Sequence, residues 1–340
     1  MCTSIVVNRK KTIVGWNLDL LDMEYRVSSS GSGVFIEIFD EKEGWLPLFG
    51  ANPEGDFVGM PTCWPYDERS ECSGQGNSII RLNIDLLLGR KTLPEIRETA
   101  ENEPVYSEPG VTFMGVLSDR EGNVLHIVPG QGNLYYERPD HAVLTNFSPF
   151  KGDSEFHPWM GMDRYKTAEA MIREAGDGFD VADCFGILKA VSQEKCPTVV
   201  SMVYDVSGKT VYWCEQRDWD NILSMRFLKQ EYIGCCGLDC ETCEARLATV
   251  RGDDELRVRV AELWSELNGV RITPDMINCT GCRVPGVKTP FCGSICVIRK
   301  CVADKPFETC GNCPEMDTCE KLEMITGRNR SALENLKMMR

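Results

Sequence analysis

The sequence predicts an α+β protein with antiparallel sheets covered by helices, followed by a small cysteine-rich domain. Strand-like segments come in pairs joined by short turns, and the helical segments lie between these pairs. Paired strands are typical of antiparallel sheets, because neighbouring parallel strands need a long crossover, usually a helix, between them. The cysteines gather near the C-terminal end, which marks a second region of different composition.

The strand pairs are read from alternating apolar residues with turn residues between them. The runs "TSIVVN" and "TIVGWNL" predict a hairpin around the charged turn "RKK" at 9–11, and "GVFIEIF" predicts a further strand. Segments 112–128 and 198–215 each hold two strand-like runs, joined at "DREGN" and "DVSGK".

Helices are predicted where apolar residues recur at spacings of three and four. Four such stretches lie in the first region: "SIIRLNIDLLLG", "LPEIRETAEN", "DRYKTAEAMIREAG" and "VADCFGILKAVSQE". In the third, Tyr165, Ala168, Met171 and Ile172 fall on one face. "DELRVRVAELWSELNGV" at 254–270 predicts an amphipathic helix in the second region, and its expected role is to cover the core there. The residues expected on its apolar face are Leu256, Val260, Leu263, Trp264 and Leu267.

The distribution of cysteine divides the chain. Six of the 18 cysteines precede residue 235, at Cys2, Cys63, Cys72, Cys184, Cys196 and Cys214, and the other twelve lie between 235 and 319. Charge changes at the same place, with a net −14 through residue 231 and −1 beyond it. We therefore expect a boundary near Gln230, with domains at 1–230 and 231–340.

Charge and hydropathy exclude several classes of partner. A net charge of −15 argues against nucleic acid, whose phosphates recruit basic surfaces. No apolar run approaches the roughly 20 residues that span a bilayer, and at the N-terminus the basic residues follow the apolar stretch, unlike those of a signal peptide. The expected location is the reducing cytoplasm, where cysteines are thiols or metal ligands rather than disulfides.

Cys2 is the candidate nucleophile. None of the three histidines lies in a recognisable nucleophile motif, and neither a G-x-S-x-G elbow nor a phosphate-binding loop is present. Removal of Met1 would make Cys2 the first residue, with an α-amine whose pKa of about 7.7–8.0 suits a general base beside its own thiol. The alternative is that Cys2 is a small apolar residue at the start of a strand.

Three stretches carry a family resemblance: "MCTSIVV" with "GWNLDL" at 15–20, "VLTNFSP" at 143–149, and "MDRYKTAEAMI" at 162–172. In this order they resemble the choloylglycine hydrolases, the family of bile-salt hydrolases and penicillin V acylases among the N-terminal-nucleophile hydrolases. The resemblance spans about residues 2–215. It implies a four-layer αββα sandwich and hydrolysis of a linear amide without a catalytic cofactor.

The resemblance also assigns roles to residues. Cys2 would be the nucleophile, and Asp19 would receive a hydrogen bond from the α-amine or hold it in place. Asn146 would donate its side-chain amide to the oxyanion, and Arg164 would organise charge near Cys2 and favour the thiolate. Relatives often form four-subunit assemblies, which leaves a homo-oligomer open for this chain.

Two positions depart from the family pattern. Trp16 stands where an arginine usually precedes the asparagine, so one cation is missing unless another such as Arg26 replaces it. A second family asparagine is absent near "GMPTCWPY" at 59–66, where Cys63 or Trp64 takes its place and a backbone N–H could serve instead. Trp16 and Trp64 could line an apolar acyl pocket or fill the core.

The second region has the cysteine spacing of a metal site. C-x2-C pairs occur in "CCGLDCETC" at 235–243, "CTGC" at 279–282 and "CGNC" at 310–313, and no histidine follows residue 157. All-thiolate ligation suits zinc, the expected metal, or an iron–sulfur cluster, and the reducing compartment disfavours the disulfide alternative. The predicted ligands are Cys235, Cys236, Cys240, Cys243, Cys279, Cys282, Cys292, Cys296, Cys301, Cys310, Cys313 and Cys319.

The segment at about 232–325 resembles small cysteine-rich domains of unknown function. These begin with a C-G-L-x-C-x-x-C signature, here "CGLDCETC". Together with the first region, this segment leads to two classes of function. The first hypothesis is a hydrolase that cleaves a small N-acyl amide through a thioester, or an acyltransferase if an amine resolves that thioester. The second is a metal-binding or redox-sensing protein whose first domain is a degenerate hydrolase scaffold.

Overall fold

The computed structural model describes residues 2–71, 76–152 and 160–339. The chain divides into two compact units, Met1–Phe227 and Leu228–Arg340, called here the N-terminal and the C-terminal unit. Cys72 and His157 lie outside the described residues. Every described cysteine is a free thiol. No helix within the described ranges is long and apolar enough to cross a membrane.

Two antiparallel sheets form the centre of the N-terminal unit. In spatial order, sheet A contains β14 (His141–Leu144), β1 (Thr3–Asn8), β2 (Thr12–Asp19), β15 (Thr198–Asp205), β16 (Thr210–Glu215) and β17 (Leu223–Arg226). Sheet B contains β13 (Gly132–Tyr136), β12 (Val124–Val128), β11 (Gly115–Ser118), β6 (Phe57–Gly59), β5 (Gly44–Ala51), β4 (Gly33–Asp40) and β3 (Tyr25–Ser30). Two short pairs accompany them: β7 (Thr62–Cys63) with β10 (Thr112–Phe113), and β8 (Asn77–Ser78) with β9 (Val105–Tyr106).

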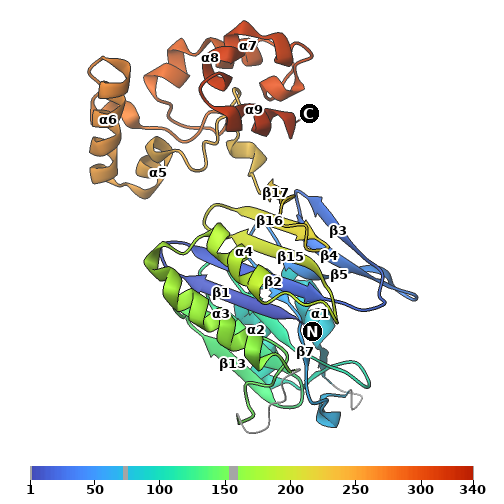
Figure 1. Cartoon of the computed structure of the whole chain (residues 1–340). Helices are drawn as coiled ribbons and strands as arrows, with labels where there is room; N and C mark the ends of the chain where they lie inside the picture. The colour runs from blue at the N-terminus through green and yellow to red at the C-terminus, as the bar shows by residue number, and fades with distance from the viewer. Residues whose placement is uncertain (1, 72–75, 153–159, 340) are drawn as a thin grey trace. The chain divides into compact units, whose positions relative to one another are not determined.

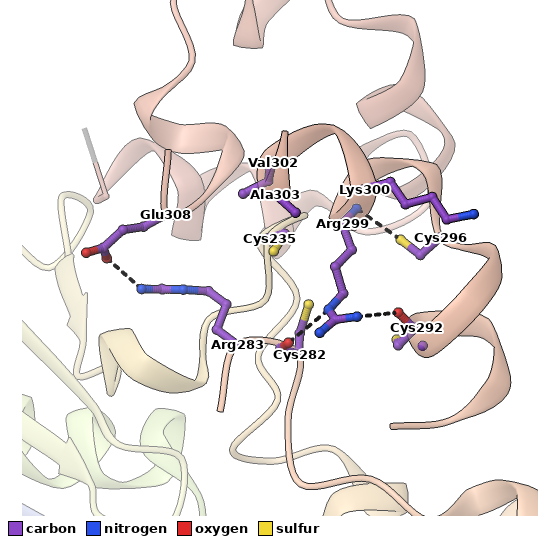
Figure 2. A pocket seen from close by; sticks show the side chains of 11 residues that line it. Cys235, Cys282, Arg283, Cys292, Cys296, Arg299, Lys300, Val302, Ala303 and Glu308 are labelled. Carbon is purple, nitrogen blue, oxygen red and sulfur yellow. Dashed lines mark hydrogen bonds and ion pairs between the residues drawn. The ribbon is translucent and has the colours of Figure 1, made fainter. Parts of the chain in front are cut away.

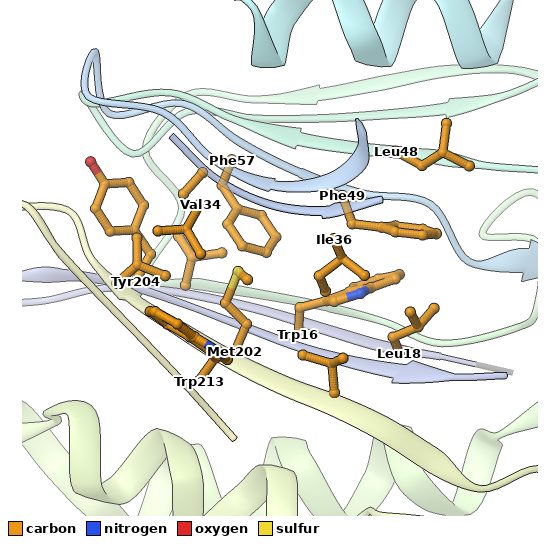
Figure 3. Packing of buried hydrophobic residues seen from close by; sticks show 14 of the residues in the cluster. Trp16, Leu18, Val34, Ile36, Leu48, Phe49, Phe57, Met202, Tyr204 and Trp213 are labelled. Atoms are coloured by element: carbon orange, nitrogen blue, oxygen red, sulfur yellow. The ribbon is translucent and has the colours of Figure 1, made fainter. Parts of the chain in front are cut away.

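The two sheets pack face to face, and helices cover their outer faces. The core between the sheets contains Trp16 and Met202 from sheet A with Ile36 and Phe57 from sheet B (Figure 3). Helices α3 (Met162–Ala175) and α4 (Val181–Ala190) pack on the outer face of sheet A (Figure 1). Helices α1 (Ile79–Leu87) and α2 (Leu93–Asn102) pack on the outer face of sheet B. The layer order is therefore αββα, which confirms the predicted fold class.

The layering explains why the first strands are apolar along their whole length. All residues of β1, β2 and β15 are buried, because one face meets the other sheet and the opposite face meets α3 or α4. The predicted hairpin at the start of the chain is confirmed, with paired residues from Thr3 and Asn17 to Asn8 and Thr12. The four predicted helices are present, although α4 ends at Ala190, earlier than the apolar pattern suggested.

The C-terminal unit consists of short helices and turns. Its helices are α5 (Glu244–Arg251), α6 (Asp254–Asn268), α7 (Val297–Ala303), α8 (Glu320–Thr326) and α9 (Arg330–Lys337). The apolar face predicted for α6 is only partly correct. Val260 is buried and Leu256 and Trp264 pack beside it, whereas Leu263 and Leu267 are 46% and 72% exposed. The neighbours of α6 cover only a narrow stripe, so the outer leucines of the pattern reach solvent.

Candidate active site

Cys2 lies at the start of β1, in the core between the two sheets, with a relative exposure of 4%. Its backbone nitrogen donates to Oδ1 of Asn146 at 2.8 Å, and its carbonyl oxygen accepts from Nη1 of Arg164 at 2.7 Å. The backbone of Cys2 is therefore fixed on both sides by side chains that come from distant parts of the sequence.

Asn146 follows β14, the strand that pairs with β1, and is completely buried. Its backbone N–H donates to Met160 and its carbonyl accepts from the Trp64 N–H at 2.8 Å. The side-chain amide donates from Nδ2 to the Thr62 carbonyl at 2.7 Å. Because an amide NH₂ carries two hydrogens, one of them engages Thr62 while Oδ1 faces Cys2 and Arg164.

Arg164 lies in the first turn of α3 and is 6% exposed. Besides Cys2, its guanidinium donates to Oγ1 of Thr3 at 2.8 Å and to Oδ1 of Asn146 at 2.8 Å. Gly161, just before the helix, has φ +84°, and a Cβ there would lie 2.3 Å from Nη2 of Arg164. Glycine is thus required at this position both by the backbone conformation and by the space that the guanidinium occupies.

Asp19 ends β2 and reaches the same cluster from the neighbouring strand. Its carboxylate accepts from Oγ1 of Thr198 at 2.5 Å and from the side-chain amide of Gln193, and it lies 3.9 Å from Nη1 of Arg164. The register of β15 shifts between Thr198 and Val200, opposite Asp19. Such bulges are common beside active sites, where they redirect side chains.

Burial is the main influence on the pKa of the Cys2 thiol. Burial raises the pKa of the Cys2 thiol, and the nearby Asp19 carboxylate raises it further. The charge of the N-terminal amine, a hydrogen bond from the Asp19 backbone and the charge of Arg164 lower this pKa, but burial outweighs them. Burial also raises the pKa of Asp19 to about 6, against hydrogen bonds and the Arg164 charge that lower it. A protonated thiol needs a base before it can attack a carbonyl.

The four residues predicted as catalytic thus converge on one place, although their contacts differ in detail from the expectation. The Cys2 nitrogen bonds to Asn146 instead of the Asp19 carboxylate, and Asp19 approaches Cys2 through its backbone N–H. Arg164 lowers the thiol pKa as expected, without overcoming burial. Their catalytic roles stay predictions.

Of the two positions expected for Trp16, lining an acyl pocket or filling the core, the structure has the tryptophan in the core. The side chain is fully buried and stacks on Phe49, with ring centroids 5.5 Å apart (Figure 3). A Cβ on Gly59 would approach the Trp16 ring to 2.6 Å, so a glycine makes room for the indole. The Nε1 of Trp16 and the Oγ of Ser4, its partner across the β1–β2 pair, are buried without a hydrogen-bond partner among the described residues.

Trp64 touches the Cys2 network through its backbone N–H, which donates to the Asn146 carbonyl, and Arg26 bonds elsewhere. Trp64 is half-buried beside Cys63 and Phe147, so its predicted contact with substrate stays a prediction. Arg26 was considered as a cation that could replace the missing family arginine near Cys2. In the structure its guanidinium pairs with Glu37 at 2.5 Å in sheet B instead.

Sequence reasoning missed the residues that hold the predicted ones. Thr3, Thr62, Thr198 and Gln193 each bond directly to a member of the cluster. Thr3 follows the nucleophile and was the only one with a positional signal. The others reach the cluster through strand order and a bulge, which no local motif reveals.

The twelve cysteines of the C-terminal unit lie on its turns and helix ends. Cys235 and Cys282 belong to its main buried cluster, and Cys240 accepts a hydrogen bond at Sγ from the Cys282 N–H at 3.5 Å. Within 2–71, 76–152 and 160–339, no three Cys, His, Asp or Glu side chains are gathered closely enough to hold a metal ion as they stand. The predicted zinc therefore stays a prediction.

Comparisons with known proteins concern both units. Residues 232–324 match the model of a family described as a protein of unknown function, DUF3795. This match confirms the resemblance of that region to small cysteine-rich domains of unknown function. No curated protein matches the chain significantly in sequence.

Three solved structures are similar to the N-terminal part of the chain. A mutant conjugated bile acid hydrolase from Clostridium perfringens is 14% identical, over 66% of this chain and 92% of that one, with a TM-score of 0.48. The N-acylethanolamine-hydrolyzing acid amidase ortholog of Caenorhabditis elegans is 18% identical, over 60% and 93%, with a TM-score of 0.43. A penicillin V acylase from Agrobacterium tumefaciens is 15% identical, over 66% and 86%, with a TM-score of 0.45.

Proposed function

We propose that the N-terminal unit is an amidohydrolase that cleaves a linear N-acyl amide with Cys2 as its N-terminal nucleophile. The observation that carries the proposal is the convergence of Asn146, Arg164 and Asp19 on Cys2 from three separate elements. A buried arginine and a buried carboxylate are costly to maintain, and their placement around one thiol is typical of a functional site.

The first step requires loss of Met1, which turns the Cys2 nitrogen into an α-amine. In its neutral form this amine takes the thiol proton, and the sulfur attacks the carbonyl carbon of the amide. A C–S bond forms while the carbonyl electron pair moves to oxygen. Because burial raises the pKa of the Cys2 thiol, a base beside the thiol is needed to remove its proton.

The second step breaks the C–N bond. The oxyanion collapses, the leaving nitrogen takes the proton held by the α-amine, and a thioester on Cys2 remains. Water then attacks the thioester and gives its proton to the amine, and the carboxylic acid leaves as the thiol is restored. If a second amine attacked in place of water, the same site would transfer the acyl group.

The oxyanion would be met by the amide of Asn146. One N–H of Nδ2 donates to the Thr62 carbonyl, and the second N–H would be the donor to a substrate oxygen. The Trp64 backbone N–H, considered as a replacement for the missing family asparagine, already donates to the Asn146 carbonyl. A donor of this kind contributes about 3–4 kcal/mol to stabilising the transition state.

The acyl group would lie in the apolar layer between the sheets, where Cys2 is in the same core as Trp16. The buried Nε1 of Trp16 and Oγ of Ser4 supply two unused polar atoms for a substrate group. Trp64 is proposed as a further contact at the edge of the site. The proposed substrates are therefore N-acyl amides with an apolar acyl chain.

The test is a panel of N-acyl amides incubated with the full chain, with the released amine and acid both quantified. Cleavage by the native protein, its loss in Cys2→Ala and its persistence in Cys184→Ala would support the proposal. A thioester on the Cys2 peptide, trapped by acid quenching, would locate the nucleophile. Cleavage that survives Cys2→Ala, or no cleavage of any acyl chain length by protein lacking Met1, would overturn it.

A further inference from the structure

Two cavities in the C-terminal unit are each lined by four cysteines. The first has a volume of about 500 Å³ and is lined by thiols from the loop that opens the unit, from the 279–282 turn and from the segment before α7 (Figure 2). Its cysteines are Cys235, Cys282, Cys292 and Cys296. Cys292 lies in a π-helical turn, η7 (Phe291–Ile295), a geometry that is rare and often found at functional sites.

The second cavity has a volume of about 270 Å³ and is built from the last third of the unit. Cys301 comes from α7, and Cys319 is the residue that precedes α8. Cys310 and Cys313 stand at either end of a short turn, and the Cys313 N–H donates to the Cys310 carbonyl at 3.1 Å. These four thiols share no member with the first cavity.

Cations accompany both sets of thiols. Arg299 donates to the carbonyls of Cys282 and Cys292, both at 3.2 Å, and thus joins two of the segments around the first cavity (Figure 2). Its backbone N–H donates to Sγ of Cys296 at 3.4 Å. Lys305 and Lys321 line the second cavity together with Glu315 and Glu320, and Lys305 pairs with Glu315 at 3.8 Å. Four thiolates around one metal carry excess negative charge, which nearby cations and N–H donors to sulfur stabilise.

The composition of its core also suggests that the C-terminal unit is stabilised by metal. Its main buried cluster contains Cys235 and Cys282, with five further cysteines packed against it, so thiols supply much of its core. Small domains with few large apolar residues commonly depend on a metal or on disulfides for stability. Every described cysteine is a free thiol, so the unit has the donors that soft metal centres require.

We propose that the C-terminal unit binds metal at two all-cysteine centres, one formed by Cys235, Cys282, Cys292 and Cys296 and the other by Cys301, Cys310, Cys313 and Cys319. The thiols stand on the cavity walls. A zinc ion, with Zn–S distances of about 2.3 Å, would draw them inward, whereas an iron–sulfur cluster would fill more of the space. The C-x2-C spacing alone leaves the grouping of the twelve cysteines open, and the two cavities divide eight of them into two sets of four.

The experiment uses the full chain purified without oxygen or chelator. Zinc, iron and acid-labile sulfide are measured per chain in the native protein and in three variants. Cys296→Ser removes a thiol of the first cavity and Cys313→Ser one of the second, whereas Cys243→Ser is the matched control from neither cavity. Two centres are expected in the native protein and in the control, and one in each of the other two variants.

A fourth variant separates loss of a ligand from misfolding. Cys313→His keeps a metal-binding side chain and should retain both centres, because imidazole also ligates zinc. Zinc without sulfide would identify mononuclear sites, and iron with sulfide and visible absorption would identify clusters. A native protein without metal, or a Cys243→Ser variant that loses a centre while Cys296→Ser keeps both, would overturn the grouping.

Discussion

Two buried thiols of the N-terminal unit, Cys2 and Cys184, differ in the polar groups that surround them. Cys184 lies on α4 among apolar side chains on the outer face of sheet A, and burial with no opposing group raises its pKa. Burial raises the pKa of Cys2 as well, but there Arg164 and the Asp19 N–H oppose the rise. Both thiols are buried, but only the pKa of Cys2 is lowered again by groups that come from separate elements.

Substitution of each of the two thiols by alanine should have the largest effect on the difference between them. Cys2→Ala should reduce amide hydrolysis by at least about a thousand-fold, because the nucleophile itself is lost. Cys184→Ala should leave kcat within about two-fold, since Cys184 contacts only the packing layer. Initial rates with the best amide of the panel provide the measurement. Equal losses of hydrolysis in the two variants would mean that the polar groups around Cys2 do not set its role apart from that of Cys184.

Removal of the proposed oxyanion donor should have the next largest effect. Asn146→Ala is expected to lower kcat by about 10²–10³-fold, with a smaller change in KM, because the amide acts mainly on charge that develops in the transition state. Steady-state kinetics and a thermal melt are measured on the same preparation. A rise in KM at unchanged kcat would assign Asn146 to substrate binding.

Arg164 should matter for stability as well as activity. Arg164→Leu leaves Asp19 buried without its cation and breaks three hydrogen bonds, so the free energy of unfolding should fall by about 3–5 kcal/mol. The control is Arg97→Leu, whose partner Glu101 is exposed and whose loss should cost less than about 1 kcal/mol. Urea unfolding measures both. A similar small cost for the two variants would contradict the account of the cluster.

The raised pKa of Asp19 predicts a specific pH dependence of stability. The folded protein holds this proton more tightly than the unfolded chain, with a pKa of about 6 against 3.8. The resulting stabilisation is complete below about pH 4 and is lost as pH rises through 6, by about 3 kcal/mol. The native protein should therefore lose about that amount of stability between pH 4 and pH 7, whereas Asp19→Asn should not. If the free energies of unfolding of the two proteins change with pH in the same way, the pKa of Asp19 is not raised.

The smallest effect concerns the core around Trp16. Gly59→Ala would place a methyl group 2.6 Å from the indole ring and should cost about 1–3 kcal/mol. Gly31→Ala is the matched control, because no atom lies within 4 Å of the added Cβ. Combining Gly59→Ala with Trp16→Phe should recover part of the loss. A Gly59→Ala protein as stable as the control would show that Trp16 is not tightly held.

Much of the fold could be predicted because its signals are local. The hairpin of β1 and β2, the four helices of the N-terminal unit and the turns near 119–123 and 205–209 follow from apolar period and turn residues. The strands β3, β13 and β17 lack full apolar alternation, since they lie at or near the sheet edges and remain partly exposed. Their pairing depends on neighbours that are distant in sequence.

The residues of the candidate site also fall into those that sequence motifs indicate and those that only the tertiary structure reveals. Cys2, Asn146 and Arg164 were found through sequence motifs, and the structure brings them within hydrogen-bonding distance. Thr62, Thr198 and Gln193 were missed because they reach the cluster through strand order and a bulge. The orientation of Asn146, with Oδ1 toward Cys2, also depends on tertiary contacts that no spacing encodes.

The most direct test of the central claim is mass spectrometry of the native chain after brief exposure to a limiting thiol alkylator, with peptide mapping. If Cys2 is the nucleophile, Met1 is absent and Cys2 is modified far faster than Cys63, Cys184 and Cys214, with the difference reduced in Asn146→Ala. Retained Met1, or a Cys2 that reacts no faster than those three buried thiols, would contradict the assignment of Cys2 as the nucleophile.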